Sequence, residues 1–127
     1  MSADFDLIGV SFYPFYTTKA TLASLRSSLD QMWTRYGKPV LVVETGWPAT
    51  NCPQVQFPSD LRSIPHTVDG QTTFFRQVAA VVDAVAGGVG LYYWEPGWVG
   101  FENVCGDNSL VDENWRARDS LKVFSSI

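Results

Sequence analysis

Hydrophobic positions along the chain alternate between short apolar runs and helical stripes. The first run, over residues 7–13, is short and mostly apolar and predicts a strand. After Thr18, which can act as an N-cap, apolar residues recur every three or four positions and predict a helix over residues 18–36. Gly37 then occupies the place of a left-handed C-cap, and Pro39 prevents continuation. The stripe of this helix consists of Leu22, Leu25, Leu29, Met32, Trp33 and Tyr36.

The second unit begins with four consecutive apolar residues, 40–43, followed directly by Glu44. An uninterrupted apolar run predicts a strand buried on both faces, as in parallel sheets. Residues 45–70 are long for a connecting loop and rich in polar residues, and loops of that length in compact domains are usually functional. A further apolar stripe predicts a helix over residues 71–86, which Gly87 ends.

The third unit repeats this order. A strand is predicted over residues 89–94, and it is followed by Glu95. A polar loop over residues 99–114 leads to a last helix predicted over residues 116–124. The residues of that helix expected to face inward are Leu121 and Phe124.

The order β-α-β-α-β-α predicts an α/β fold with a parallel sheet and helices outside it. A doubly wound sheet normally has about five strands, and only three are found here. A (β/α)₈ barrel needs about 250 residues, so a chain of 127 residues supplies roughly half. Polar and aromatic residues gather just beyond each strand, where such barrels carry their chemistry. We therefore expect residues 1–127 to form one part of a TIM barrel with three βα units.

Composition excludes several classes of function. A net charge of −4 and a pI of about 4.7 argue against a nucleic-acid partner. No apolar run approaches the roughly 20 residues of a membrane span, and residues 1–6 lack the pattern of a signal peptide. Two cysteines and one histidine leave no room for a zinc cluster, and neither a phosphate-binding glycine loop nor a serine-hydrolase elbow occurs, so no metal or cofactor is expected.

Glu44 is the first candidate for chemistry, because a charge that ends a buried strand is costly unless hydrogen bonds compensate it. The alternative is a glutamate that emerges into solvent. Trp47 follows closely, and aromatic rings beside a carboxylate suit a sugar, whose ring faces stack while its hydroxyls pair with carboxylates. Tyr13 and Trp94 occupy the matching ends of the other two strands. For each of Tyr92, Tyr93 and Trp94, a core role is an equally good interpretation. Glu95 could be a second acid, or it could be salt-bridged or solvated.

Two further groups are weaker candidates. Asp107, Asn108 and Asp112 supply oxygen ligands without the full spacing of a cation site, and a solvated loop is favoured. His66 stands in a proline-rich loop without a neighbouring serine or aspartate pattern, which indicates a structural or surface role.

The strand ends resemble glycoside hydrolase family 53, the arabinogalactan endo-β-1,4-galactanases, and most closely its fungal members. The resemblance rests on residues 11–15, 38–47 and 90–96, and on 106–112 and 120–124 near the end of the chain. These segments follow the family order along nearly all of the chain.

The resemblance implies a (β/α)₈ barrel of which this chain supplies strands six to eight, and hydrolysis of galactan or arabinogalactan with retention through two glutamates. By motif, Glu44 corresponds to the nucleophile and Tyr13 to the tyrosine that orients it. Trp94 corresponds to the floor of the position where the bond breaks, and Trp47 and Trp98 to further sugar contacts, with Glu95 beside them. It also implies an extracellular location.

The chain departs from the family pattern in one respect. The family's acid/base glutamate lies on the fourth strand within an Asn-Glu pair, and no such dipeptide occurs here. Three interpretations remain open: part of a glycosidase, a non-catalytic galactan-binding or interaction module, and an inactive barrel fragment. Three parallel strands leave two unpaired edges, so a second copy or a complementing N-terminal half is an expected partner.

The two cysteines, Cys52 and Cys105, each lie in a loop that follows a strand. Neighbouring parallel strands lie about 4.8 Å apart, so loops leaving them can bring two Cα atoms within the roughly 4.4–6.8 Å of a disulfide. The oxidising compartment implied by the resemblance favours a bridge. The alternative is two unpaired buried thiols.

Overall fold

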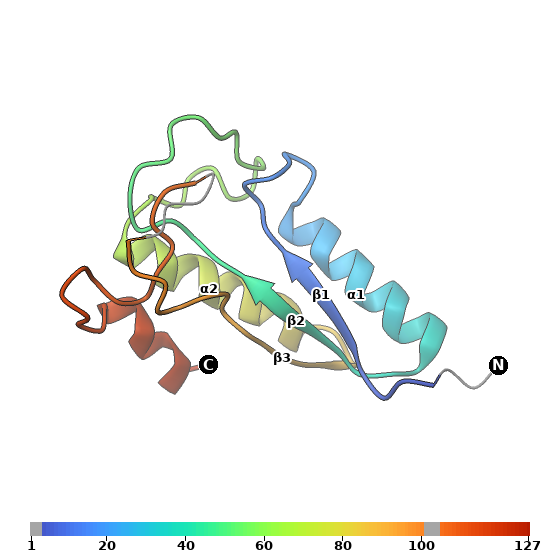
Figure 1. The fold of residues 1–127 in the computed structure, drawn as a ribbon. Helices are drawn as coiled ribbons and strands as arrows, with labels where there is room; N and C mark the ends of the chain where they lie inside the picture. The colour runs from blue at the N-terminus through green and yellow to red at the C-terminus, as the bar shows by residue number, and fades with distance from the viewer. Residues whose placement is uncertain (1–3, 101–104) are drawn as a thin grey trace.

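A computed structural model describes residues 4–100 and 105–127. Strands and helices alternate along the chain as predicted, and the three strands form one parallel sheet in the order β1-β2-β3 (Figure 1). The elements are β1 (Ile8–Phe12), α1 (Leu22–Tyr36), β2 (Val40–Thr45), α2 (Val68–Asp83), β3 (Gly88–Leu91) and the 3-10 helix η1 (Asp119–Ser125).

Both α-helices begin at threonine caps that differ from the predicted starts. The Thr21 side chain accepts a hydrogen bond from the Ser24 N–H at 2.9 Å, so α1 begins after Thr21 and not after Thr18. Thr67 caps α2 in the same way, so this helix begins three residues before the expected start, ahead of its apolar stripe. The predicted C-cap of α1 is confirmed: Gly37 has a φ of 61°, in the left-handed region.

The last helix differs from its prediction in type and in its buried face. It is a 3-10 helix, in which residues three apart share a face, and this geometry buries Ser120 and Val123. Leu121 and Phe124, which were predicted to face inward, are therefore exposed. The Phe124 ring still packs on Phe75 of α2, with ring centres 4.6 Å apart.

The core lies between the sheet and its helices. Leu29 of α1 and Phe74 of α2 pack in one cluster with Val42 of the central strand, so both helices cover the same face. The other face carries no helix among the described residues, and Val43 on it is 37% exposed. The prediction that the whole 40–43 run is buried on both faces is therefore wrong at Val43. No helix in the part of the chain that the structure describes is long and apolar enough to cross a bilayer.

Candidate active site

A β-bulge places Glu44 on the open side of the sheet. Val42 and Thr45 are both fully buried although they lie three residues apart, whereas strict alternation would put them on opposite faces. The pairing of β1 with β2 shifts at this point: Val10 is opposite Val42, but the next residue, Ser11, is opposite Glu44. The extra residue in β2 leaves both Val43 and Glu44 more exposed than their neighbours.

Tyr13 and Glu44 are joined across the ends of β1 and β2. The Tyr13 hydroxyl donates a hydrogen bond to Glu44 Oε2 over 3.2 Å. Burial of the phenol, together with the negative charge of Glu44, raises the pKa of Tyr13 well above its usual value. Tyr13 therefore remains a neutral donor that holds one oxygen of the carboxylate.

A cleft of about 280 Å³ surrounds this pair, and it is lined by Tyr13, Phe15, Tyr16, Glu44, Trp94, Glu95, Trp98, Asn108 and Ser109. Residues that follow β1 and β3 contribute to it, together with Glu44 from the end of β2 itself. Five of the predicted site residues are thus brought together: Tyr13, Glu44, Trp94, Glu95 and Trp98.

Four lining residues were not predicted to lie in this cleft: Phe15, Tyr16, Ser109, and Asn108, which was considered only as a weak cation ligand. The two aromatic residues follow Tyr13 directly after Pro14, so their position after a strand end was an available signal. The other two belong to the long loop after β3, and nothing in their spacing indicates which loop residues turn toward the cleft.

Alternation beyond β3 presents Trp94 to the cleft. Backbone hydrogen bonds from Tyr92 N to Val42 O and from Trp94 N to Thr45 O, both 2.8 Å, continue the ladder past the end of the strand. Side chains therefore continue to alternate between the two faces of the sheet: Tyr93 is buried, whereas Tyr92 and Trp94 on either side of it are exposed, Trp94 to 44%. Glu95 then adopts a φ of 48°, a left-handed conformation that is uncommon for a non-glycine residue and that often marks functional sites.

Trp47 lies in the core and not in the cleft. Its exposed fraction is 0%, and its indole ring stacks on Phe74 at 4.7 Å and contacts Phe57 at 4.8 Å. The indole N–H donates to the Pro65 carbonyl at 3.0 Å. Both faces and the polar edge are thus occupied by protein, and the structure contradicts the predicted sugar contact of Trp47.

A buried polar network fixes the cleft loops relative to the sheet. The Tyr93 hydroxyl accepts a hydrogen bond from Trp47 N at 3.0 Å and donates to Asn108 O at 2.7 Å. Gln71 of α2 donates from its amide to Trp47 O at 3.0 Å and to Ser109 O at 3.2 Å. Two buried side chains therefore tie the loop after β2 to the loop after β3, where Asn108 and Ser109 line the cleft.

The predicted disulfide is present. Cys52 and Cys105 are bonded, with their Cα atoms 4.9 Å apart, inside the expected range. The bridge joins the same two loops as the polar network. His66 holds the backbone at one end of the disulfide: its Nδ1 accepts a hydrogen bond from Cys52 N at 3.3 Å, and its ring packs against Phe57. His66 thus has the structural role that its sequence context indicated.

Two of the three candidate cation ligands, Asp107 and Asp112, have other partners, whereas Asn108 Oδ1 is buried without a hydrogen bond from any described residue. Burial opposes ionisation of Asp107, but hydrogen bonds from Arg118 and Ser109 outweigh it, and the pKa of that carboxyl lies below its usual value. Asp112 accepts hydrogen bonds from the backbone N–H groups of Asn114 and Arg116. Within residues 4–100 and 105–127, no group of three or more His, Cys, Asp or Glu side chains is placed to hold a metal ion.

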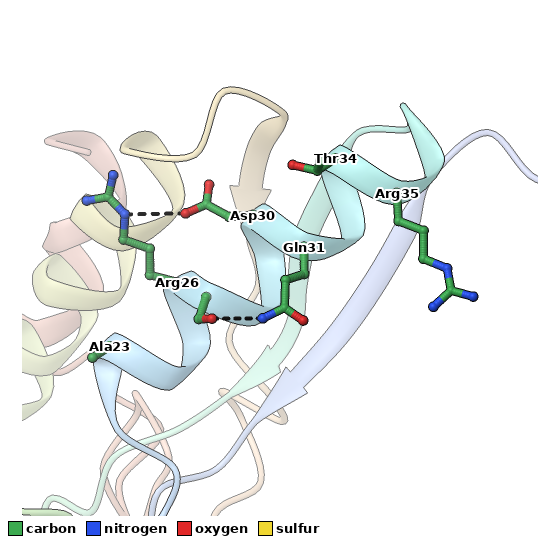
Figure 2. Close-up of a pocket in the computed structure, with 7 residues that line it drawn as sticks. Ala23, Arg26, Asp30, Gln31, Thr34 and Arg35 are labelled. Atoms are coloured by element: carbon green, nitrogen blue, oxygen red, sulfur yellow. Dashed lines mark hydrogen bonds and ion pairs between the residues drawn. The ribbon is translucent and has the colours of Figure 1, made fainter.

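A larger hollow of about 630 Å³ lies on the outer face of α1 (Figure 2). Its lining comes from α1 alone, and it is crossed by an exposed Arg26–Asp30 ion pair and a Gln31–Ser27 hydrogen bond. It contains no exposed aromatic ring and lies away from the strand ends, so the cleft around Glu44 is the candidate active site.

Comparison with solved structures defines the class of fold. The chain matches a structure of fungal β-1,4-galactanases with a TM-score of 0.94 and 50% identity, over 98% of this chain and 39% of that one. It also matches the GH53 catalytic domain of Ignisphaera aggregans, with a TM-score of 0.75 and 26% identity, over 96% and 39%. A β-glucuronidase of Dictyoglomus thermophilum shares the fold alone, at 18% identity and a TM-score of 0.67. The chain thus has the fold of the C-terminal part of a (β/α)₈ barrel.

The family follows from the sequence comparison. Residues 1–124 match the model of glycosyl hydrolase family 53, and the chain belongs to this family. It is 53% identical to arabinogalactan endo-β-1,4-galactanase A of Emericella nidulans, in a match that covers all of this chain. It is 51% identical to the arabinogalactan endo-β-1,4-galactanase of Humicola insolens, in a match that covers 98% of this chain. It spans 37% and 39% of the lengths of these two relatives.

Proposed function

We propose that residues 1–127 are part of the catalytic domain of an extracellular endo-β-1,4-galactanase, and that Glu44 is its nucleophile. The observation that carries this proposal is the hydrogen bond from Tyr13 to Glu44 inside a cleft walled by Trp94 and Trp98. The family and the names of the relatives give the substrate, a galactan or arabinogalactan. The Cys52–Cys105 disulfide fits an oxidising compartment.

In the proposed retaining mechanism, one Glu44 oxygen attacks the anomeric carbon while Tyr13 holds the other. The bond from that carbon to the leaving oxygen breaks, and the leaving oxygen takes the electron pair and a proton from a second carboxyl group about 5–5.5 Å from the nucleophile. By resemblance to the family, we infer that this second group lies on the fourth strand of the barrel, whereas this chain corresponds to strands six to eight. The chain would then supply the nucleophile, and a complementing barrel half would supply the proton.

This division of roles gives a test that needs no proton donor. A dinitrophenolate leaving group departs without protonation, so Glu44 can displace it from an activated β-1,4-galactobioside. On the proposed division of roles, the general base that activates water for hydrolysis lies in the complementing barrel half, so the adduct should accumulate on the isolated chain. We expect mass spectrometry of a digest to find the glycosyl group on Glu44, and Glu44→Gln to abolish the adduct.

The labelling experiment distinguishes the alternatives when binding of β-1,4-galactotetraose is measured in parallel. A non-catalytic galactan-binding module would bind β-1,4-galactotetraose but form no adduct, and an inactive fragment would do neither. Labelling of the chain that persists in Glu44→Gln would contradict the assignment of the nucleophile.

A further inference from the structure

Tyr16 is an exposed aromatic residue on the wall of the cleft. Its side chain lines the same cavity as Glu44 and is 65% exposed, more than Trp94 at 44% or Trp98 at 46%. Scattered exposed aromatic rings are common on protein surfaces, but this ring stands in a cleft beside two exposed indoles and a candidate nucleophile.

The Tyr16 ring is also held in place from behind. The Tyr16 N–H donates to the Tyr13 carbonyl at 3.2 Å and closes a tight turn. The ring packs edge-on against Tyr13 at 5.7 Å and against Phe15 at 4.9 Å, and Phe15 is itself buried. A ligand that stacks on Tyr16 therefore meets a surface that is largely preorganised, which lowers the entropic cost of binding.

The position of the Tyr16 ring relative to Glu44 fits a second unit of the proposed substrate. Tyr16 contacts Tyr13, and Tyr13 donates to Glu44, so Tyr16 lies one aromatic ring away from the candidate nucleophile. A galactopyranose ring has a face of C–H groups that stacks on aromatic rings, and a neutral sugar needs no charged partner. We propose that Tyr16 forms a second galactosyl-binding position, which holds a unit of the β-1,4-galactan chain beyond the unit that contacts Trp94. This inference rests on the proposed function, from which it takes its ligand.

The test compares a long and a short ligand on the folded chain. We would measure the Kd of β-1,4-galactotetraose by titration calorimetry and that of galactose by chemical-shift titration, for the wild type, Tyr16→Ala, Tyr16→Phe and Trp94→Ala. Trp115→Ala is the matched control, because Trp115 is 73% exposed and does not line the cleft. Circular dichroism of each variant reports the fold.

Tyr16→Ala is expected to raise the Kd of the tetraose about three- to tenfold, the scale of one lost stacking contact. The Kd of galactose, which occupies a single position, should change less than twofold. Tyr16→Phe keeps the ring and should resemble the wild type, as should Trp115→Ala. A tetraose Kd unchanged in Tyr16→Ala, with binding lost in Trp94→Ala, would overturn this inference alone. A wild-type chain that binds no tetraose would overturn the proposed function together with it.

Discussion

At the residue scale, the Tyr13–Glu44 hydrogen bond is the most specific feature of the cleft. It joins side chains from two strand ends, and its donor stays neutral because burial and the adjacent carboxylate both raise the pKa of Tyr13. A donor fixed on one carboxylate oxygen directs the other toward a substrate. On the proposed function, we therefore expect Tyr13 to orient Glu44 and not to exchange protons.

Removing the Tyr13 hydroxyl should slow the chemistry without removing the nucleophile. Tyr13→Phe is expected to decrease the rate at which the activated galactobioside labels Glu44 by about ten- to hundredfold, because hydrogen bonds to charged groups contribute roughly 1.5–3 kcal/mol. Labelling is followed by intact-mass measurements over time. Tyr36→Phe, an exposed tyrosine at the end of α1, is the control and should label at the wild-type rate. Equal rates in both variants would exclude the orienting role.

His66 makes stability depend on pH. Burial lowers the pKa of His66 below its usual value of 6.5, so the unfolded chain binds a proton more readily than the folded chain. Stability is complete above about pH 6.5 and decreases as the pH falls toward the pKa of the folded state. The chain has one histidine, so a His66→Asn variant, which retains an acceptor near Nδ1, should lose this dependence. Urea unfolding at several pH values between about 5 and 7.5 measures it, and parallel pH dependences in the two proteins would contradict it.

At the element scale, the polar network and the disulfide act on the same pair of loops, those that follow β2 and β3. The network joins the loops by hydrogen bonds to Trp47 and Asn108, whereas the disulfide joins them by a covalent bond. Their contributions can be separated by substitution.

Tyr93→Phe is expected to destabilise the fold by about 1–3 kcal/mol, because it leaves Trp47 N and Asn108 O buried without this partner. Tyr92→Phe removes the same hydroxyl from a neighbouring tyrosine that is 65% exposed, and should change stability by less than about 0.5 kcal/mol. Thermal unfolding compares the two variants. Similar melting temperatures would show that the buried hydroxyl does not fasten the loops.

The disulfide closes a segment with a sequence separation of 53 residues. On the chain-entropy account, loss of the bridge costs up to about 4 kcal/mol of unfolding free energy. Replacing both Cys52 and Cys105 by serine should therefore shift the urea midpoint strongly, and reduction of the wild type should reproduce the shift. A midpoint that does not change on reduction would count against a stabilising bridge.

An element could be predicted from the sequence where apolar residues on one face determine it. The stripe of α1 and its Gly37 cap indicated the helix correctly, because burying one face of a helix imposes the spacing directly. The bulge before Glu44 and the 3-10 form of η1 were not predictable, since both depend on how neighbouring elements pack. Trp47 and Trp98 show the same limit in the site: both follow strand ends, and only contacts with Phe74 and Phe57 make Trp47 a core residue.

At the scale of the whole molecule, the described sheet has two edges and one open face. β1 and β3 each pair on one side only, with β2 (Figure 1). Large apolar side chains are exposed in or next to the three strands and η1: Leu7, Val43, Val89, Tyr92, Leu121, Phe124 and Ile127. Unpaired edges and apolar patches of this kind bind further strands or copies of the same chain.

The isolated chain should therefore self-associate, or expose a surface that binds hydrophobic dye. Val89 in β3 is 60% exposed, and a charge on an edge strand prevents strand addition, so Val89→Lys should decrease both association and dye binding. Thr34→Lys adds the same charge to the outer face of α1, away from either edge, and is expected to leave association unchanged (Figure 2). Sedimentation velocity at several concentrations measures association, and dye fluorescence measures the exposed surface. A compact wild-type monomer that binds no dye would contradict this prediction, and equal effects of the two lysines would show that net charge, and not the β3 edge, controls association.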